Sequence, residues 1–111
     1  MSTLQDLSSK FGTLAAQLIA TAGNLVPPFM GGDEDILSDR AENSETTQSH
    51  IDDLIRSGTA VQQPHIDSCD LAVNQALASM TTINNGMPGS MTKPLVLAQT
   101  DNSNKIGMAL P

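Results

Sequence analysis

Aromatic residues are nearly absent from this sequence. It has no Trp and no Tyr, and Phe11 and Phe29 are the only aromatic rings among 111 residues. Aromatic rings supply much of the buried area in protein cores and cofactor pockets. Leu, Ile, Val and Phe together make up about 23% of the chain, just above the roughly 20% below which disorder is common. We therefore expect a folded protein with a small aliphatic core and no bound cofactor.

Charged residues are also scarce, and lysine especially so. Charged residues make up 15% of the chain, against about 25% in typical domains, and lysine occurs only at Lys10, Lys93 and Lys105. Protein interfaces are depleted in lysine and glutamate, so this composition fits a surface covered by a partner. A solvated surface rich in Ser and Thr fits it equally well. The net charge of -7 and the lack of a Lys/Arg cluster argue against nucleic-acid binding.

The sequence has one cysteine and no long apolar run. Cys69 alone excludes an intramolecular disulfide and a metal site built from several cysteines, which favours an intracellular or virion location over secretion. The uncharged segment 11–32 is interrupted by Gln17, Asn24 and a Pro-Pro pair. Its apolar stretch is shorter than the ~20 residues that cross a bilayer, so we do not expect a membrane span.

The first region, residues 1–26, has the pattern of an amphipathic helix over about 3–24. Ser2 with Gln5, or Thr3 with Asp6, supplies the signals for its start, and Gly23 and Pro27 supply the stop. Apolar residues recur at alternating spacings of three and four, which places them on one face of a helix. These residues are Leu4, Leu7, Phe11, Leu14 and Leu18.

The second region, residues 27–58, begins with a Pro-Pro and Gly-Gly linker at 27–32. The acidic tract 33–53 follows and accounts for the whole net charge of the chain. Its first part, 33–49, has few apolar anchors, and we expect it to form a mobile or extended arm. The end of the region predicts a short helix with Ile51, Leu54 and Ile55 on one face and Gly58 as a left-handed cap.

The third region, residues 59–85, predicts a second amphipathic helix over 64–84. Pro64 suits the first turn of a helix, and Asn85-Gly86 ends the pattern. Its apolar residues again alternate three and four apart: Ile66, Cys69, Val73, Ala76, Met80 and Ile83. Two such helices predict an antiparallel helical pair with the short helix alongside.

The last region, residues 86–111, contains Pro88, Gly89, Pro94, Gly107 and Pro111. These helix-breaking residues predict an extended C-terminal arm in place of a long helix. Two short apolar runs, at 95–97 and 106–110, predict a β-hairpin with a turn at 101–104. The expected fold is therefore mainly α, a small helical hairpin or bundle with long irregular arms and a C-terminal β-hairpin.

The sequence contains no recognisable catalytic or metal-binding motif. His65 and Cys69, with Asp67 or Asp70, give at most three ligands, whereas a structural zinc site uses four. The same Cys-His pair has no third group to orient it as a nucleophile and base. There is also no phosphate-binding loop or nucleophile elbow. We therefore expect no enzyme activity, no metal and no cofactor.

The leading hypothesis is a non-enzymatic structural or accessory subunit of a larger protein assembly, such as a phage capsid cement, neck or tail protein. We expect it to be oligomeric or bound to other subunits, the same or different. The predicted partner-binding residues are Leu4, Leu7, Phe11, Leu14, Leu18, Ile66, Val73, Met80, Leu95 and Leu97.

Two alternatives stay open. One is a soluble acidic adaptor or regulator that binds a basic protein through residues 33–53. The other is an interfacial membrane peptide that uses residues 11–29, although this segment has no Lys or Arg to favour anionic lipids.

Overall fold

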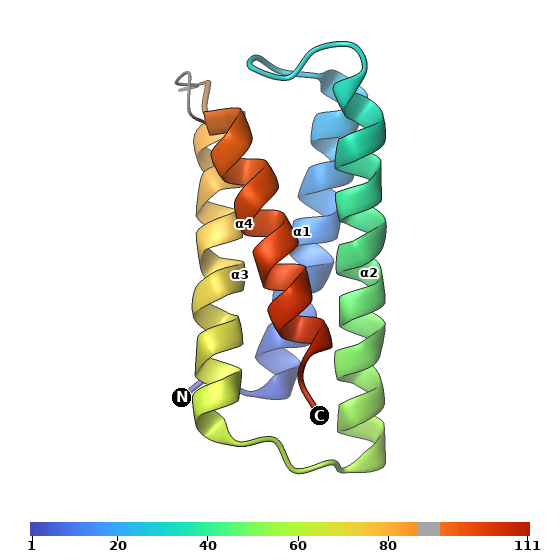
Figure 1. Ribbon diagram of the computed structural model, residues 1–111, viewed down its shortest axis with the longest axis vertical. Coiled ribbons are helices and arrows are strands. Elements are labelled where there is room, and N and C mark those ends of the chain that lie inside the picture. The colour runs from blue at the N-terminus through green and yellow to red at the C-terminus, as the bar shows by residue number, and fades with distance from the viewer. Residues whose placement is uncertain (87–91) are drawn as a thin grey trace.

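Four α-helices make up nearly all of the computed structural model, which describes residues 1–86 and 92–111. They are α1 (Leu4–Asn24), α2 (Asp33–Ser57), α3 (Gln63–Asn84) and α4 (Thr92–Met108). The described residues contain no β-strand. The fold is a four-helix bundle measuring 42 × 21 × 18 Å (Figure 1).

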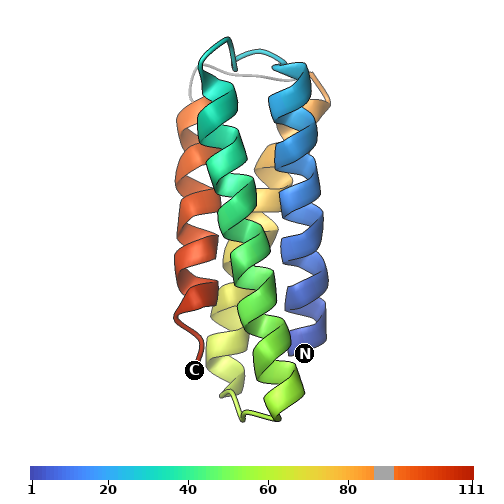
Figure 2. The same ribbon diagram turned by 90° about the vertical axis from the view of Figure 1, so that its right-hand side faces the viewer.

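The bundle consists of two antiparallel hairpins, α1/α2 and α3/α4. Helices α1 and α4 each pack against both α2 and α3, so the pairs α1–α4 and α2–α3 lie across the diagonals. The α2–α3 connection crosses one end of the bundle, where both chain termini also lie (Figure 1). Figure 2 shows α4 running beside α2, parallel to it. Helix α2 therefore has the α1 and α4 contacts on its inner side and a free outer side.

The expected start and stop signals operate at three helix ends. The Thr3 side chain accepts from the Asp6 backbone N–H, and the Asp6 carboxylate accepts from the Thr3 N–H, which forms a capping box. Gly58, at φ 67°, closes α2 in the left-handed conformation. Pro64 lies in the first turn of α3. The helices predicted over 3–24 and 64–84 are confirmed.

The core lies along the axis of the bundle and is almost entirely aliphatic. Helix α1 contributes Leu7, Phe11, Leu14 and Leu18, all fully buried. The other helices complete it mainly with Leu37, Ala41, Ile51, Cys69, Val73, Ala76, Met80, Ile83 and Val96. The two predicted apolar seams thus contribute to one core inside one chain. The predicted antiparallel pairing of these two helices is wrong: α2 reverses the chain between them, so α1 and α3 run parallel, and the antiparallel partner of α1 is α2 (Figure 1).

The predicted arm at 33–49 is wrong, because this segment forms the first two thirds of α2. Leu37 and Ala41 anchor it to the core, and the next inward positions are held by Ser44 and Thr47. Both hydroxyls donate to the carbonyl four residues earlier, on Arg40 and Asn43, so they are satisfied within the helix. Because polar residues occupy these inward positions, the hydropathy pattern of the sequence does not show the helical period there.

The predicted C-terminal β-hairpin and extended arm are also wrong: residues 92–108 form α4, while 87–91 of that arm lie outside the described residues. Pro94 is tolerated because it falls in the first turn, where backbone N–H groups have no intrahelical partner. The buried positions of the helix are Val96, Thr100, Ser103, Asn104 and Gly107. Their spacing of three and four is helical, but only Val96 is a large apolar residue.

Candidate functional site

Most of the predicted partner-binding residues lie inside the bundle. The buried ones are Leu7, Phe11, Leu14, Leu18, Ile66, Val73 and Met80. Leu4 and Leu97 are partly buried against the core, while Leu95 on α4 is 49% exposed. The buried seams therefore make contacts within the chain, and a partner-binding role for them stays a prediction.

The outer side of α2 carries a group of acidic side chains, which we call the acidic face. Five exposed carboxylates form it: Glu34, Asp35, Asp39, Glu42 and Glu45. At the ~100° per residue of an α-helix, they fall within an arc of about 140°. No hydrogen bond or ion pair engages any of them in the described structure. Their charge is left to solvent or to a partner.

None of the basic side chains forms an ion pair with the five carboxylates of this face in the described structure. Four of the basic side chains form ion pairs, each with a carboxylate outside the acidic face: Lys10–Asp70, Lys93–Asp33, Lys105–Asp101 and Arg56–Asp53. The fifth, Arg40, extends toward α4, where its Nε donates to the Leu97 carbonyl at 3.4 Å. Salt bridges within the chain therefore leave the acidic face uncompensated, and the net charge of the protein is concentrated there.

The first turn of α2 also explains why acidic residues begin the tract. Asp33, Glu34 and Asp35 all lie at the helix N-terminus, where a negative charge complements the helix dipole. Gly32, at φ 98°, precedes the helix without a side-chain cap. Asp33 turns inward, accepts from the Met30 backbone N–H and pairs with Lys93 of α4. Only Asp33 of these three is used to hold the fold.

Acidification is expected to weaken the α2–α4 contact at this ion pair. The hydrogen bond from Lys93, 2.9 Å away, and the one from Met30 lower the pKa of Asp33 below its ordinary value of 3.8. A carboxylate with a lowered folded-state pKa stabilises the fold above that ordinary value and loses this contribution as the pH falls through the folded-state pKa. Thermal melts should place the wild type above Lys93→Met near neutral pH, with the two converging in acid. Parallel melting curves across the pH range would contradict this.

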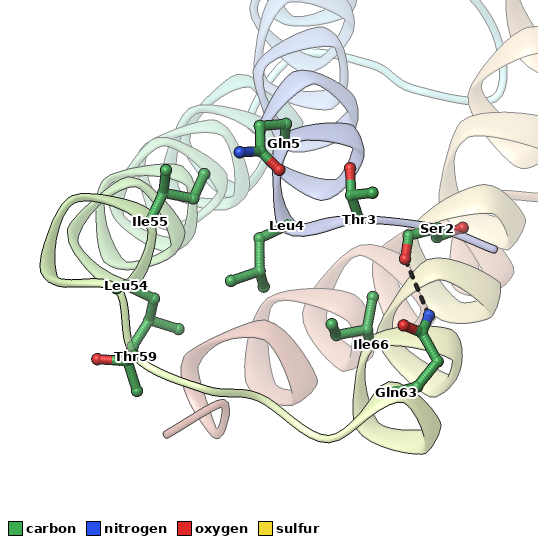
Figure 3. A pocket seen from close by; sticks show the side chains of 10 residues that line it. Ser2, Thr3, Leu4, Gln5, Leu54, Ile55, Thr59, Gln63 and Ile66 are labelled. Carbon is green, nitrogen blue, oxygen red and sulfur yellow. Dashed lines mark hydrogen bonds between the residues drawn. The ribbon is translucent and has the colours of Figure 1, made fainter.

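A hollow lies at the end of the bundle where the N-terminus meets the α2–α3 connection (Figure 3). It encloses about 340 Å³, and Leu4 lies between side chains of α2 and α3, including Leu54 and Ile66. At its rim, Gln63 Nε2 donates to the Ser2 carbonyl at 2.9 Å. None of the residues lining it is titratable, so this hollow offers no general acid, base or charged nucleophile.

The cysteine and histidines are dispersed. Cys69 is fully buried in the core, and burial, with a smaller effect from the Asp70 carboxylate, raises the pKa of its thiol to about 11. His50 Nε2 donates to the Leu110 carbonyl at 2.7 Å, whereas His65 is exposed on α3. Across residues 1–86 and 92–111, no three His, Cys, Asp or Glu side chains are grouped to hold a metal ion.

No protein-family model, curated protein or solved structure matches this chain. Among the described residues, no helix combines the length and apolar character needed to cross a membrane. The acidic face is the one feature of the sequence-predicted sites that the fold turns outward as a continuous surface. The tract was visible in the sequence, but its confinement to one side of a regular helix was not.

Proposed function

We propose that this protein is a non-enzymatic binding subunit that docks onto a basic surface of another protein through the acidic face of α2. The observation that carries the proposal is the set of five exposed, unpaired carboxylates within one arc of a single helix. The protein is still proposed to be a subunit of a larger assembly, but its contact surface is now the acidic face of α2 in place of the apolar seams. Its placement in a virion stays a prediction.

The arrangement favours an extended basic partner over a metal ion. Glu34 and Glu45 lie eleven residues apart on α2, which corresponds to about 16 Å along a helix axis. Calcium needs six to eight oxygens at roughly 2.3–2.6 Å from one point, and carboxylates spread over this length do not converge. Nucleic acid carries the same sign of charge and is repelled. Lysine and arginine side chains spaced along a protein surface match both the sign and the length.

The acidic face is held in place before binding. Leu37 and Ala41, on the opposite side of α2, are buried in the core, and the helix is continuous through the tract. A preformed helix loses little conformational entropy when it docks. Concentrated charge also accelerates encounter with an oppositely charged partner, and does so less at high ionic strength.

Binding to a lysine- and arginine-rich helical peptide, followed by calorimetry, tests the proposal. The triple variant Asp35→Asn/Asp39→Asn/Glu42→Gln removes three charges of the acidic face. At ~0.5 kcal/mol for each exposed charge pair, affinity should fall about tenfold. Affinity of the wild type should also fall with added salt, because the Debye length shortens from about 30 Å at 0.01 M to about 10 Å at 0.1 M.

A matched control distinguishes binding by the acidic face from binding that depends only on the net charge of the protein. Asp6→Asn/Asp67→Asn/Asp101→Asn removes the same number of charges from exposed or partly exposed positions on the other three helices. This control should bind the peptide nearly as well as the wild type. Equal losses of affinity in both triple variants would show attraction to net charge alone, and would sink the proposal.

A further inference from the structure

Helix α4 differs from the other helices in what it buries. Thr100, Ser103, Asn104 and Gly107 are among its inward residues, and Val96 is the only large apolar side chain within the helix that is fully buried. Helix α1, at the opposite corner, buries four large apolar side chains. Apolar burial contributes about 25 cal/mol per Å² of area removed from water, so α4 gains much less from docking than α1.

Polar contacts hold α4 along its whole length instead. Near its start, Lys93 pairs with Asp33 of α2 at 2.9 Å. In its second half, the Ser44 hydroxyl shares its one proton between the Arg40 carbonyl of its own helix and Asn104 Oδ1 of α4, which lies 3.0 Å away. Asn104 Nδ2 in turn donates to the Arg40 carbonyl at 3.4 Å. Beyond its end, the Leu110 carbonyl accepts from His50 Nε2 at 2.7 Å. On α3, the Ser79 hydroxyl bonds to the Gln99 side chain.

Contacts of this kind can be exchanged for water at small cost. A hydrogen bond within a protein contributes only about 1 kcal/mol net, because both groups bond to water once they separate. Besides Val96, the described C-terminal segment 92–111 packs only Leu97, Ile106 and Leu110 against the core. Separation of α4 therefore exposes less apolar surface than separation of α1 or α3 would. Proteins open first in units with few buried apolar contacts, and α4 is that unit here.

We propose that α4 is a lid, which swings away from α1–α3 as a unit while the other three helices stay folded. The last turn of the lid covers Phe11, since a methyl group added at Gly107 would meet the Phe11 ring at 3.1 Å. Opening uncovers Phe11 and removes Ile106 and Leu110 from the hollow that they share with His65 and Ser68, which lie beside Cys69 on α3. The protein thereby exposes an apolar surface transiently without unfolding.

The single cysteine reports this opening. Cys69 is fully buried in the closed bundle, so an aromatic disulfide reagent reacts with it only after the bundle opens. If α4 is a lid, labelling under native conditions should be faster than global unfolding allows and should depend only weakly on urea, because little surface is exposed. Labelling that follows the global unfolding equilibrium, with the full urea dependence, would overturn the proposal.

Two glycine substitutions provide a matched pair. An alanine methyl at Gly107 would overlap the Thr47 methyl across the α2–α4 contact, whereas one at Gly23 meets nothing within 4 Å. Gly107→Ala should speed Cys69 labelling at least tenfold with helix content retained, and Gly23→Ala should leave the rate unchanged or lower it. Equal rates in the two variants would count against a lid.

A variant that should stabilise the closed bundle tests the proposal even if Gly107→Ala does not fold. Ser44→Ala/Asn104→Leu replaces a buried polar pair with apolar groups of similar size, a change that removes both partners together. A lid held by this pair should then close more tightly, and Cys69 labelling should slow several-fold. An unchanged or faster rate in this variant would contradict the proposal.

Discussion

Leu14→Asp is expected to abolish the folded state. The Leu14 side chain is fully buried in the core. Four of the five Lys and Arg residues already form ion pairs with other carboxylates, so these four are not free to pair with an aspartate at this position. Burying an unpaired carboxylate costs several kcal/mol or more, in addition to the packing lost with the leucine. Since domains are stable by only about 5–15 kcal/mol, far-UV circular dichroism should show loss of helix.

Two companion variants define the specificity of this effect. Val73→Asp, at a fully buried position of α3, should unfold the protein in the same way. Glu42→Gln, on the exposed acidic face, should change stability by less than about 0.5 kcal/mol. A bundle that tolerates all three substitutions equally would refute the packing of α1 against α3.

Phe11→Ala should produce the largest loss of stability among substitutions that keep the protein folded. Phe11 is fully buried and lies beneath Gly107 of α4, so its removal leaves a cavity shared by α1 and α4. Such truncations cost about 3–5 kcal/mol. Urea denaturation followed by circular dichroism measures the change, which should appear as a lower midpoint with an unchanged slope.

Ile19→Ala on the same helix is the control for this cavity. Ile19 is 53% exposed, so truncation removes little buried area and should cost less than about 1 kcal/mol. If the two truncations destabilise α1 by similar amounts, Phe11 is not at the centre of the core.

The sequence predicted the helical segments whose inward faces are apolar, including the end of α2 at Ile51 and Leu54 with its Gly58 cap. It missed the first part of α2 and all of α4, whose inward faces are largely polar. Leu7, Phe11 and Leu14 repeat at spacings of three and four, so α1 follows from pattern alone. In α2 and α4 the same positions hold residues such as Ser44, Thr47 and Thr100. Their hydroxyls bond to carbonyls of their own helix, which makes burial tolerable but removes the hydropathy signal.

The acidic residues of the candidate site could be predicted from the sequence, but their arrangement on one side of a helix could not. The concentration of acids in residues 33–53 is visible in the sequence, and the expectation of a mobile arm there followed from its few apolar residues. A regular α2 changes the physical meaning of the charges, because Asp35, Asp39 and Glu42 then lie on one side at fixed spacing. The helix itself depends on tertiary packing of Leu37 and Ala41, which no local pattern supplies.

Carbodiimide cross-linking to the lysine- and arginine-rich peptide, mapped by mass spectrometry, measures directly whether the acidic face of α2 contacts a basic partner. The reagent joins a carboxylate to a lysine amine only where the two lie in contact. We expect cross-links at Asp35, Asp39 and Glu42 on α2, and we expect them to be lost when salt is raised. Cross-links concentrated at Asp6 and Asp67, with α2 unmodified, would contradict it.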